Sequence, residues 1–249
     1  MSVEGRTVDA SPAVPLEPPE GDAGGSGDVP RGRLLGWLAL VAALTTLAYA
    51  ANAAEQGDPP QDLLYRWSTV VGGVVQYGII LAILLLLARG LDRRVLGLRR
   101  PVSWGHAAVL IVGGYLSILV VGAVLNLFLK AGEEQGLVPD EWDSSRAAPF
   151  FANVVVVAGV APIVEELSFR GLGFAAVRSA WGVAAAVLVT SAVFGLAHGL
   201  VVALPVLVVF GLVLAVVRQR TESLYPPIIL HALFNGMALL VAVTLGGGT

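Results

Sequence analysis

Seven apolar segments, each close to the length that crosses a membrane, constrain this chain more than any other feature. They cover residues 34–54, 68–88, 106–129, 150–167, 181–198, 201–217 and 228–245. Roughly 20 apolar residues in a helix span the hydrocarbon core of a bilayer. The chain is 56% hydrophobic and only 13% charged, too few charges to cover so much apolar surface in a soluble domain. We therefore predict an all-α polytopic membrane protein with about seven transmembrane helices, or eight if a further or re-entrant segment is present.

The start of the chain has a different composition. Residues 1–30 are rich in proline, glycine, serine and acidic side chains and lack apolar periodicity. Such a segment cannot bury a core, so we predict a disordered tail over 1–32 and a single transmembrane domain over 33–249. The acidic start does not resemble a signal peptide, and the first apolar segment is expected to act as an uncleaved targeting signal.

The charges between the apolar segments predict an orientation. The arginine-rich connections contain Arg31, Arg33, Arg89, Arg93, Arg94, Arg99, Arg100, Arg218 and Arg220. The connection after the third segment is acidic and contains Glu133, Glu134, Asp140, Glu141 and Asp143. The positive-inside rule places the arginines and the amino terminus in the cytoplasm. Ala/Val/Gly/Arg-rich, Lys-poor usage is typical of a GC-rich bacterium, so we expect the bacterial inner (plasma) membrane.

Several classes of chemistry and partner are excluded by composition. The chain has no cysteine, which excludes disulfides, thiolate zinc sites and a cysteine nucleophile. It contains no His-Glu-x-x-His string, the usual zinc-protease motif. We find no basic surface interleaved with aromatic residues, so no nucleic-acid partner is predicted. Composition does not determine the oligomeric state.

Ionisable residues lie within the later apolar segments. Glu165 and Glu166 belong to the fourth, Arg170 follows it closely, and two of the three histidines, His198 and His231, lie in later ones. Such groups are costly inside a membrane and usually mark a functional site. Glutamate and histidine also activate water in hydrolases and bind zinc. The first three segments have almost no ionisable residues in their interiors, so we interpret them as a lipid-facing scaffold. The cavity of an active site is expected among the carboxyl-terminal helices, at about 150–245.

The two adjacent glutamates are expected to differ in role. Neighbours on a helix are about 100° apart, so their carboxylates point to different faces. Glu166 and Arg170 are four residues apart, which favours an ion pair, whereas Glu165 remains free. The alternative is that both glutamates mark a solvated helix end at the membrane interface.

A helical hairpin would bring Glu165 and His198 together. A polar break lies at 178–182. If the fourth helix continues to that break, both residues lie roughly 22–27 Å from the same end of the hairpin. His198 alone could be structural. His231 and Asn235 share a helix face and could instead be polar contacts between helices. Counted from Arg220, His231 should lie nearer the cytoplasmic side than His198, and the sequence does not resolve this difference in depth.

Three motifs resemble those of the CPBP intramembrane proteases. They are Glu-Glu-x-x-x-Arg at Glu165, Glu166 and Arg170, Phe-x-x-x-His at Phe194 and His198, and His-x-x-x-Asn at His231 and Asn235. Each is weak alone, but three in this order within apolar segments are specific. The family includes CAAX prenyl proteases and bacterial bacteriocin-processing or self-immunity proteins, once grouped as abortive-infection proteins. The resemblance covers roughly residues 150–245.

The resemblance implies a membrane endopeptidase acting on a peptide or membrane-protein substrate. Glu165 and His198 would activate the attacking water, His231 and Asn235 would stabilise the oxyanion, and Glu166, Arg170 and Phe194 would support them. Glu165, His198 and His231 could hold a divalent ion such as zinc with an open fourth position. They could equally act without metal. Two other readings stay open: a non-catalytic immunity or scaffold protein that binds a peptide or partner in the same pocket, and a proton-coupled transporter.

Overall fold

The computed structural model describes residues 29–54, 62–129 and 142–245, and this part of the chain is all-helical. Residues 1–28 of the predicted tail and most of the acidic connection lie outside the described residues, and the predicted tail boundary at 32 is wrong because Arg31 and Gly32 already begin the first helix. The main helices are α1 (Arg31–Ala54), α2 (Trp67–Leu87), α3 (Trp104–Leu129), α5 (Ala147–Val155), α6 (Ala161–Glu166), α7 (Phe174–Leu196), α8 (Leu204–Thr221) and α9 (Tyr225–Leu245). The predicted all-α polytopic membrane architecture is confirmed.

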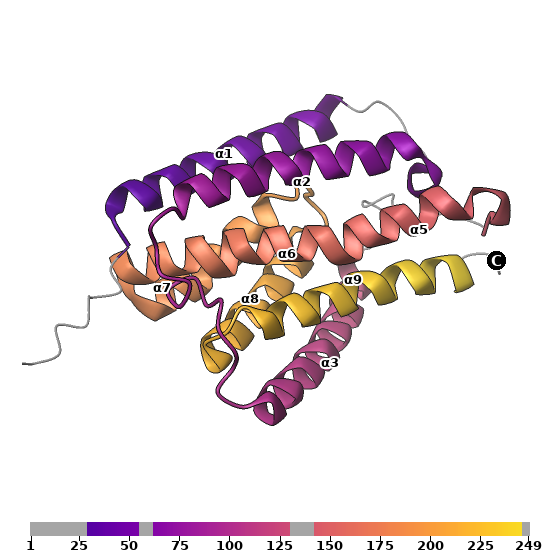
Figure 1. The fold of residues 1–249 in the computed structure, drawn as a ribbon. Coiled ribbons are helices and arrows are strands. Elements are labelled where there is room, and N and C mark those ends of the chain that lie inside the picture. Colours follow the sequence, from indigo (N-terminus) through magenta and orange to yellow (C-terminus); the bar gives the residue numbers. More distant parts are fainter. Residues whose placement is uncertain (1–28, 55–61, 130–141, 246–249) are drawn as a thin grey trace, which may run out of the picture.

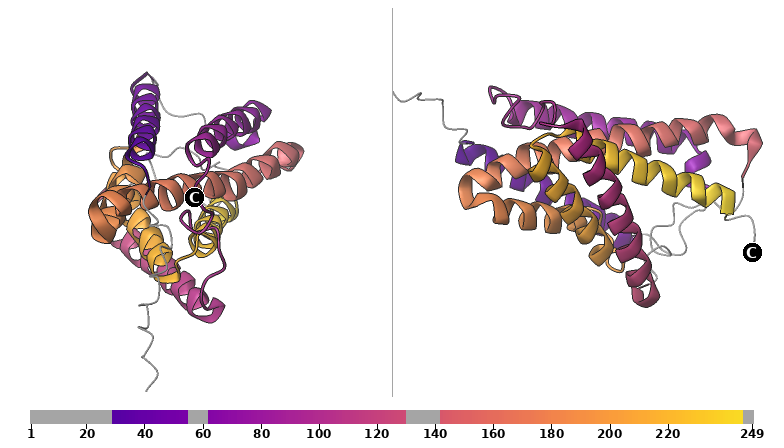
Figure 2. Two further views of the ribbon diagram at one scale, coloured as in Figure 1. Left: turned by 60° about the vertical axis from the view of Figure 1, so that its left-hand side comes forward. Right: turned by 90° about the horizontal axis from the view of Figure 1, so that it is seen from below.

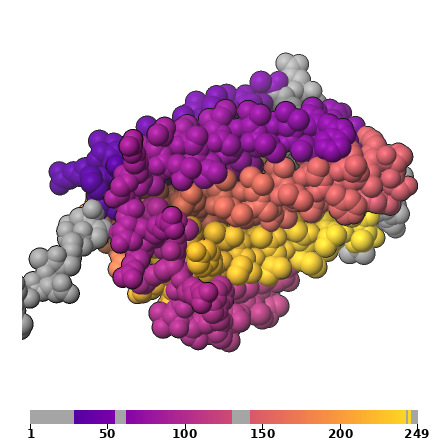
Figure 3. All heavy atoms as spheres, viewed as in Figure 1, coloured from indigo at the N-terminus to yellow at the C-terminus, as the bar shows by residue number. Residues whose placement is uncertain are grey.

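The helices form an elongated bundle (Figure 1). On the face drawn in Figure 3, α2, the path from α5 to α7, and α9 lie in neighbouring bands, and α3 lies beyond α9. Figure 2 shows that α3 is inclined to the other helices. It packs against α8 and α9. Because of this inclination, part of α3 stands away from the bundle. The rest of α3 lies next to helices that hold the motif residues.

The path from α5 to α7 contains the predicted hairpin. Gly182 has φ 85° and ψ 177°, so α7 is two helical arms joined at a sharp bend. The bend falls within the polar break that the sequence indicates. Glu165 lies 17 residues before Gly182 and His198 lies 16 after it, which confirms the nearly equal depth of the two residues.

Five helical stretches of the described part are long and apolar enough to cross a membrane, by length and composition. One is the 53-residue stretch Ser144–Leu196, which bends back at Gly182, and Tyr225–Val241 is a shorter apolar helix. These features support an integral membrane protein. The number of spans stays a prediction.

Two widened, π-helical turns interrupt the path and flank α6. The first, Val156–Val160, ends two residues before Pro162. The backbone N–H of Ala161 bonds the carbonyl of Val156, and Pro162 has no N–H to donate. The carbonyl of Val157 is therefore left without its usual helical donor. Such turns are frequent at functional sites.

The second turn, Leu167–Gly173, explains how His231 can reach the depth of His198 although it follows Arg220 closely in sequence. The N–H of Phe174 donates to the carbonyls of Phe169 and Gly171. The carbonyl of Arg170 is thereby left without its usual helical donor. Arg218, near the end of α8, donates its Nε–H to the Arg170 carbonyl at 3.1 Å. Arg170 lies roughly 18 Å along the helix from the bend at Gly182. The turn from α8 to α9 therefore lies deeper than the hairpin bend, so α9 begins already close to the level of the site.

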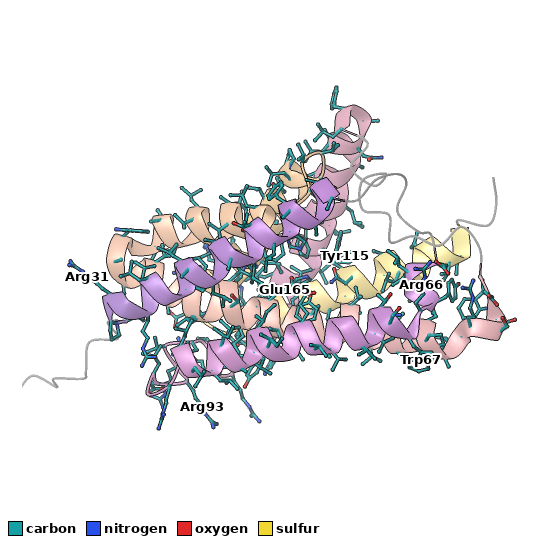
Figure 4. All side chains as sticks on the ribbon, turned by 90° about the horizontal axis from the view of Figure 1, so that it is seen from above. Arg31, Arg66, Trp67, Arg93, Tyr115 and Glu165 are labelled. Carbon is teal, nitrogen blue, oxygen red and sulfur yellow. The ribbon has the colours of Figure 1, made fainter. Side chains whose placement is uncertain are left out.

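The two ends of the bundle differ in charge. Figure 4 shows Arg31 and Arg93 at one end and Arg66 at the other, with Glu165 between them. At the second end, Arg66 and Arg146 both pair with Asp62. There, hydrogen bonds from Ser145 and Arg146 hold the pKa of Asp143 at about 2. Arginines at this end are thus neutralised by acids, in agreement with the predicted orientation. The cytoplasmic amino terminus itself stays a prediction.

The contact between α1 and the π-helical turn Leu167–Gly173 depends on Gly173. A Cβ atom at Gly173 would lie 2.4 Å from ring atoms of Trp37, a fully buried and rigid side chain. We expect Gly173→Ala to lower the free energy of unfolding by about 1–3 kcal/mol, because α1 must shift away. Thermal unfolding in detergent measures this. Gly159→Ala, in the same helical path but with open space around its Cβ, is the matched control and should not destabilise. An unchanged melting temperature for Gly173→Ala would contradict this packing.

Candidate active site

One cavity of about 600 Å³ brings the predicted site residues together. Glu165, Phe194, His198, His231 and Asn235 all line it. The remaining wall is mainly apolar and includes residues of α3 from Ile118 to Asn126. The carboxyl-terminal helices therefore supply most of the cavity, as predicted, while α2 and α3 complete its wall.

The two glutamates lie on different sides of α6, as the helical geometry predicts. The side chain of Glu165 is 18% exposed, whereas that of Glu166 is fully buried. The hydroxyl of Tyr77 donates a hydrogen bond to Oε1 of Glu165, with 2.6 Å between the two oxygens. Oε2 of Glu165 lies 3.8 Å from Nε2 of His231. Glu165 is thus the carboxylate that reaches the cavity, and the interpretation of both residues as a solvated helix end is wrong.

The predicted ion pair of Glu166 and Arg170 is confirmed. Nη1 of Arg170 donates to Oε1 of Glu166 at 3.1 Å, and Nη2 donates to the carbonyl of Gly211 at 2.8 Å. The guanidinium also lies over the ring of Phe194, 4.5 Å from its centroid. Arg170 therefore joins α6, α7 and α8 behind the cavity.

His231 is oriented by Glu166. Its Nδ1 lies 3.0 Å from Oε1 of Glu166, and a carboxylate can only accept there, so Nδ1 carries the proton. This arrangement leaves Nε2 directed at Glu165. The imidazole is nearly fully buried, in edge contact with Phe210 at 5.0 Å between centroids. Glu166 thus bonds His231 as well as Arg170. The sequence did not predict the bond to His231.

His198 is oriented by the backbone and by α1. Its Nδ1 lies 2.7 Å from the carbonyl of Phe194, so this nitrogen donates and the neutral ring has an unprotonated Nε2. The following turn includes Gly199, with φ 70°, whose carbonyl accepts from Asn52 at 2.9 Å. A Cβ atom at Gly199 would lie 2.7 Å from Ala48. The end of α1 is therefore packed closely against the turn that carries His198.

Asn235 joins α9 to the first π-helical turn. Its Nδ2 donates to the carbonyl of Val157 at 3.0 Å. This is the carbonyl left without a helical donor, because the N–H of Ala161 bonds Val156 and Pro162 has no N–H. One of the two Nδ2 hydrogens is thereby used, and the second is left for another acceptor.

Tyr77 was missed by the sequence reasoning, because it belongs to a segment interpreted as scaffold, and the partner of the structural residue Asn52 was not predicted. Tyr77 comes from α2 and Asn52 from α1. The available signal was a lone polar group in each apolar segment. A hydroxyl or amide buried in a membrane helix needs a partner, but the sequence does not say which one.

The described residues contain no group of three histidine, cysteine, aspartate or glutamate side chains placed to hold a metal ion. Among the candidate ligands Glu165, His198 and His231, one oxygen of Glu165 is already bonded by Tyr77. This arrangement does not form a three-ligand site. Both predictions, a bound divalent ion and a metal-free mechanism, stay untested.

Comparison with known proteins shows which family the site region is similar to. Residues 147–237 match the model of the Rce1-like type II CAAX prenyl endopeptidases. The match runs from the start of α5 into α9 and includes all seven predicted site residues. The chain is also 23% identical over 189 residues to "Putative membrane peptidase YdiL" of Bacillus subtilis (strain 168), covering 74% of this chain and 77% of that protein. No solved structure matches. The resemblance drawn from the three motifs is confirmed over this region: residues 147–237 are similar to the Rce1-like type II CAAX prenyl endopeptidases.

Proposed function

We propose that this protein is an intramembrane endopeptidase that hydrolyses a peptide bond with water activated by Glu165 and His198. The observation that carries the proposal is the convergence of Glu165, His198, His231 and Asn235 on one cavity. The coarser conclusion, a CAAX-type membrane protease, follows from the family match.

Water activation uses the carboxylate of Glu165 and Nε2 of His198. Both line the cavity, and neither is occupied by Arg170. A water hydrogen-bonded to the Glu165 carboxylate and to Nε2 of His198 loses a proton to Glu165 as its oxygen attacks the substrate carbonyl. The carbon–nitrogen bond then breaks, and the same proton passes to the leaving amine. The two products are a carboxylic acid and an amine.

The oxyanion is stabilised by donors on α9. Asn235 has one Nδ2 hydrogen left beside the bond to Val157. His231 can donate from Nε2 only when both ring nitrogens carry protons, since Nδ1 already donates to Glu166. With both glutamates ionised and Arg170 charged, that second proton brings the formal charge of the buried cluster to zero. Removing one oxyanion donor typically costs a factor of about 10²–10³ in rate.

The mainly apolar cavity wall suits an apolar peptide or membrane-protein segment within the bilayer. Within the bilayer core, the backbone groups of such a substrate have no water to bond. Hydrogen bonds from the site to the substrate backbone therefore stabilise the bound state. The arginine-rich end of the bundle supports the predicted cytoplasmic amino terminus.

We expect cleavage to survive removal of divalent metals. The reason is the position of Glu165, which already has Tyr77 and His231 as neighbours in an arrangement suited to a general base. The purified protein in proteoliposomes would be treated with a chelator and assayed on apolar model peptides by mass spectrometry, with metal content per chain measured in parallel. Loss of cleavage that is restored by zinc, together with one zinc per chain, would show metal dependence. Substrate flux without any cleavage would overturn the endopeptidase proposal in favour of a transporter.

A further inference from the structure

The hydroxyl of Tyr77 connects the presumed scaffold to the site. Tyr77 is on α2, 88 residues before Glu165, and donates to its Oε1 at 2.6 Å. It lines the cavity and packs partly buried against the hydrophobic core. None of the three motifs includes α2, and the family match begins only at residue 147.

A close approach of α2 to the helical path makes this contact. Gly73 lies one turn before Tyr77, on the same face of α2. A Cβ atom at Gly73 would lie 2.8 Å from Cγ1 of Val156, in the first π-helical turn. The absence of a side chain at Gly73 therefore lets α2 lie against this path, within reach of Glu165. The neighbouring Gln76, in contrast, is exposed.

The hydrogen bond fixes the direction of the Glu165 carboxylate. With Oε1 bonded to Tyr77, Oε2 lies toward His231 but stays 3.8 Å away, longer than a hydrogen bond. Without the hydroxyl, the carboxylate could rotate and pair directly with His231. That pairing would remove the base and an oxyanion donor at once.

We propose that Tyr77 is a positioning residue that keeps Glu165 apart from His231 and aimed at the attacking water. This inference rests on the proposed function of Glu165. A hydrogen bond to a charged group holds a catalytic side chain within the tolerance of the reaction, where a misplacement of about 1 Å can cost about 100-fold in rate.

Removing the hydroxyl tests this role. Tyr77→Phe is expected to lower kcat about 10- to 100-fold with KM within about twofold, since the apolar wall that binds substrate is retained. The control is Tyr115→Phe on α3, whose ring contacts Phe234 in the same region. That variant should keep wild-type kcat. Melting temperature and folded fraction are measured for each variant, and kcat is normalised to folded protein.

A second pair of variants separates position from chemistry. Gly73→Ala should also lower kcat at unchanged KM, because it moves α2 away while keeping the hydroxyl. Gly72→Ala, with open space around its Cβ, should not. Wild-type kcat in both Tyr77→Phe and Gly73→Ala would overturn the role of Tyr77. If Glu165→Gln itself retained full activity, the proposed function would fail instead, so the two failures are distinguishable.

Discussion

Replacing Glu165 with glutamine is expected to lower peptide cleavage about 10²- to 10⁴-fold, the usual contribution of a general base. Glutamine keeps the shape of the side chain and an oxygen that can accept from Tyr77, but it cannot take a proton from water. Glu165 is partly exposed to the cavity and has no partner among the described arginines, so the fold should tolerate the change. The measurement is kcat/KM on a cleaved peptide in proteoliposomes, with insertion and melting temperature determined for the same sample.

A matched control makes the same chemical change elsewhere. Glu222 lies at the arginine-rich end, half exposed and paired with Arg99. Glu222→Gln should leave cleavage unchanged. If Glu165→Gln lost cleavage but kept the biological effect of the protein, the effect would come from binding, as in an immunity or scaffold protein. Undiminished cleavage by folded Glu165→Gln would refute its role as the base.

The part of the site that could be predicted is the part governed by helical periodicity. The four-residue spacing of Glu166 and Arg170 predicted their ion pair, and the distance to the polar break predicted that Glu165 and His198 line the same cavity. Both inferences use only rise and rotation per residue, which every α-helix shares. Local geometry of this kind is present in the sequence itself.

Contacts between helices far apart in sequence could not be predicted in this way. The depth of His231 depends on Arg218 bonding the Arg170 carbonyl, a contact made available by a widened turn. That turn breaks the regular periodicity on which depth counting relies. Tyr77 reaches Glu165 only because Gly73 lets α2 come close. A single chain without aligned relatives does not reveal which helices are neighbours.

Replacing Arg170 with methionine is expected to lower the free energy of unfolding by about 3–5 kcal/mol, the range for losing one member of a buried ion pair. Both side chains are fully buried, so Glu166 would keep an uncompensated charge with only His231 beside it. The bond to Gly211 on α8 and the contact with Phe194 would be lost as well. The measurement is thermal and chemical unfolding in detergent, together with the yield of inserted protein.

The double variant Glu166→Gln, Arg170→Met should be more stable than Arg170→Met alone, because it removes the uncompensated charge with its partner. The pair is also incompletely bonded: among the described residues, Oε2 of Glu166 and Nε of Arg170 have no hydrogen-bond partner. Restored folding should not restore full cleavage, since a neutral amide holds a protonated His231 less well than a carboxylate. If the single variant were as stable as wild type, the pair would not hold α6, α7 and α8 together. If the double variant were no more stable than the single one, the loss would come from the missing Gly211 and Phe194 contacts instead of from a buried charge.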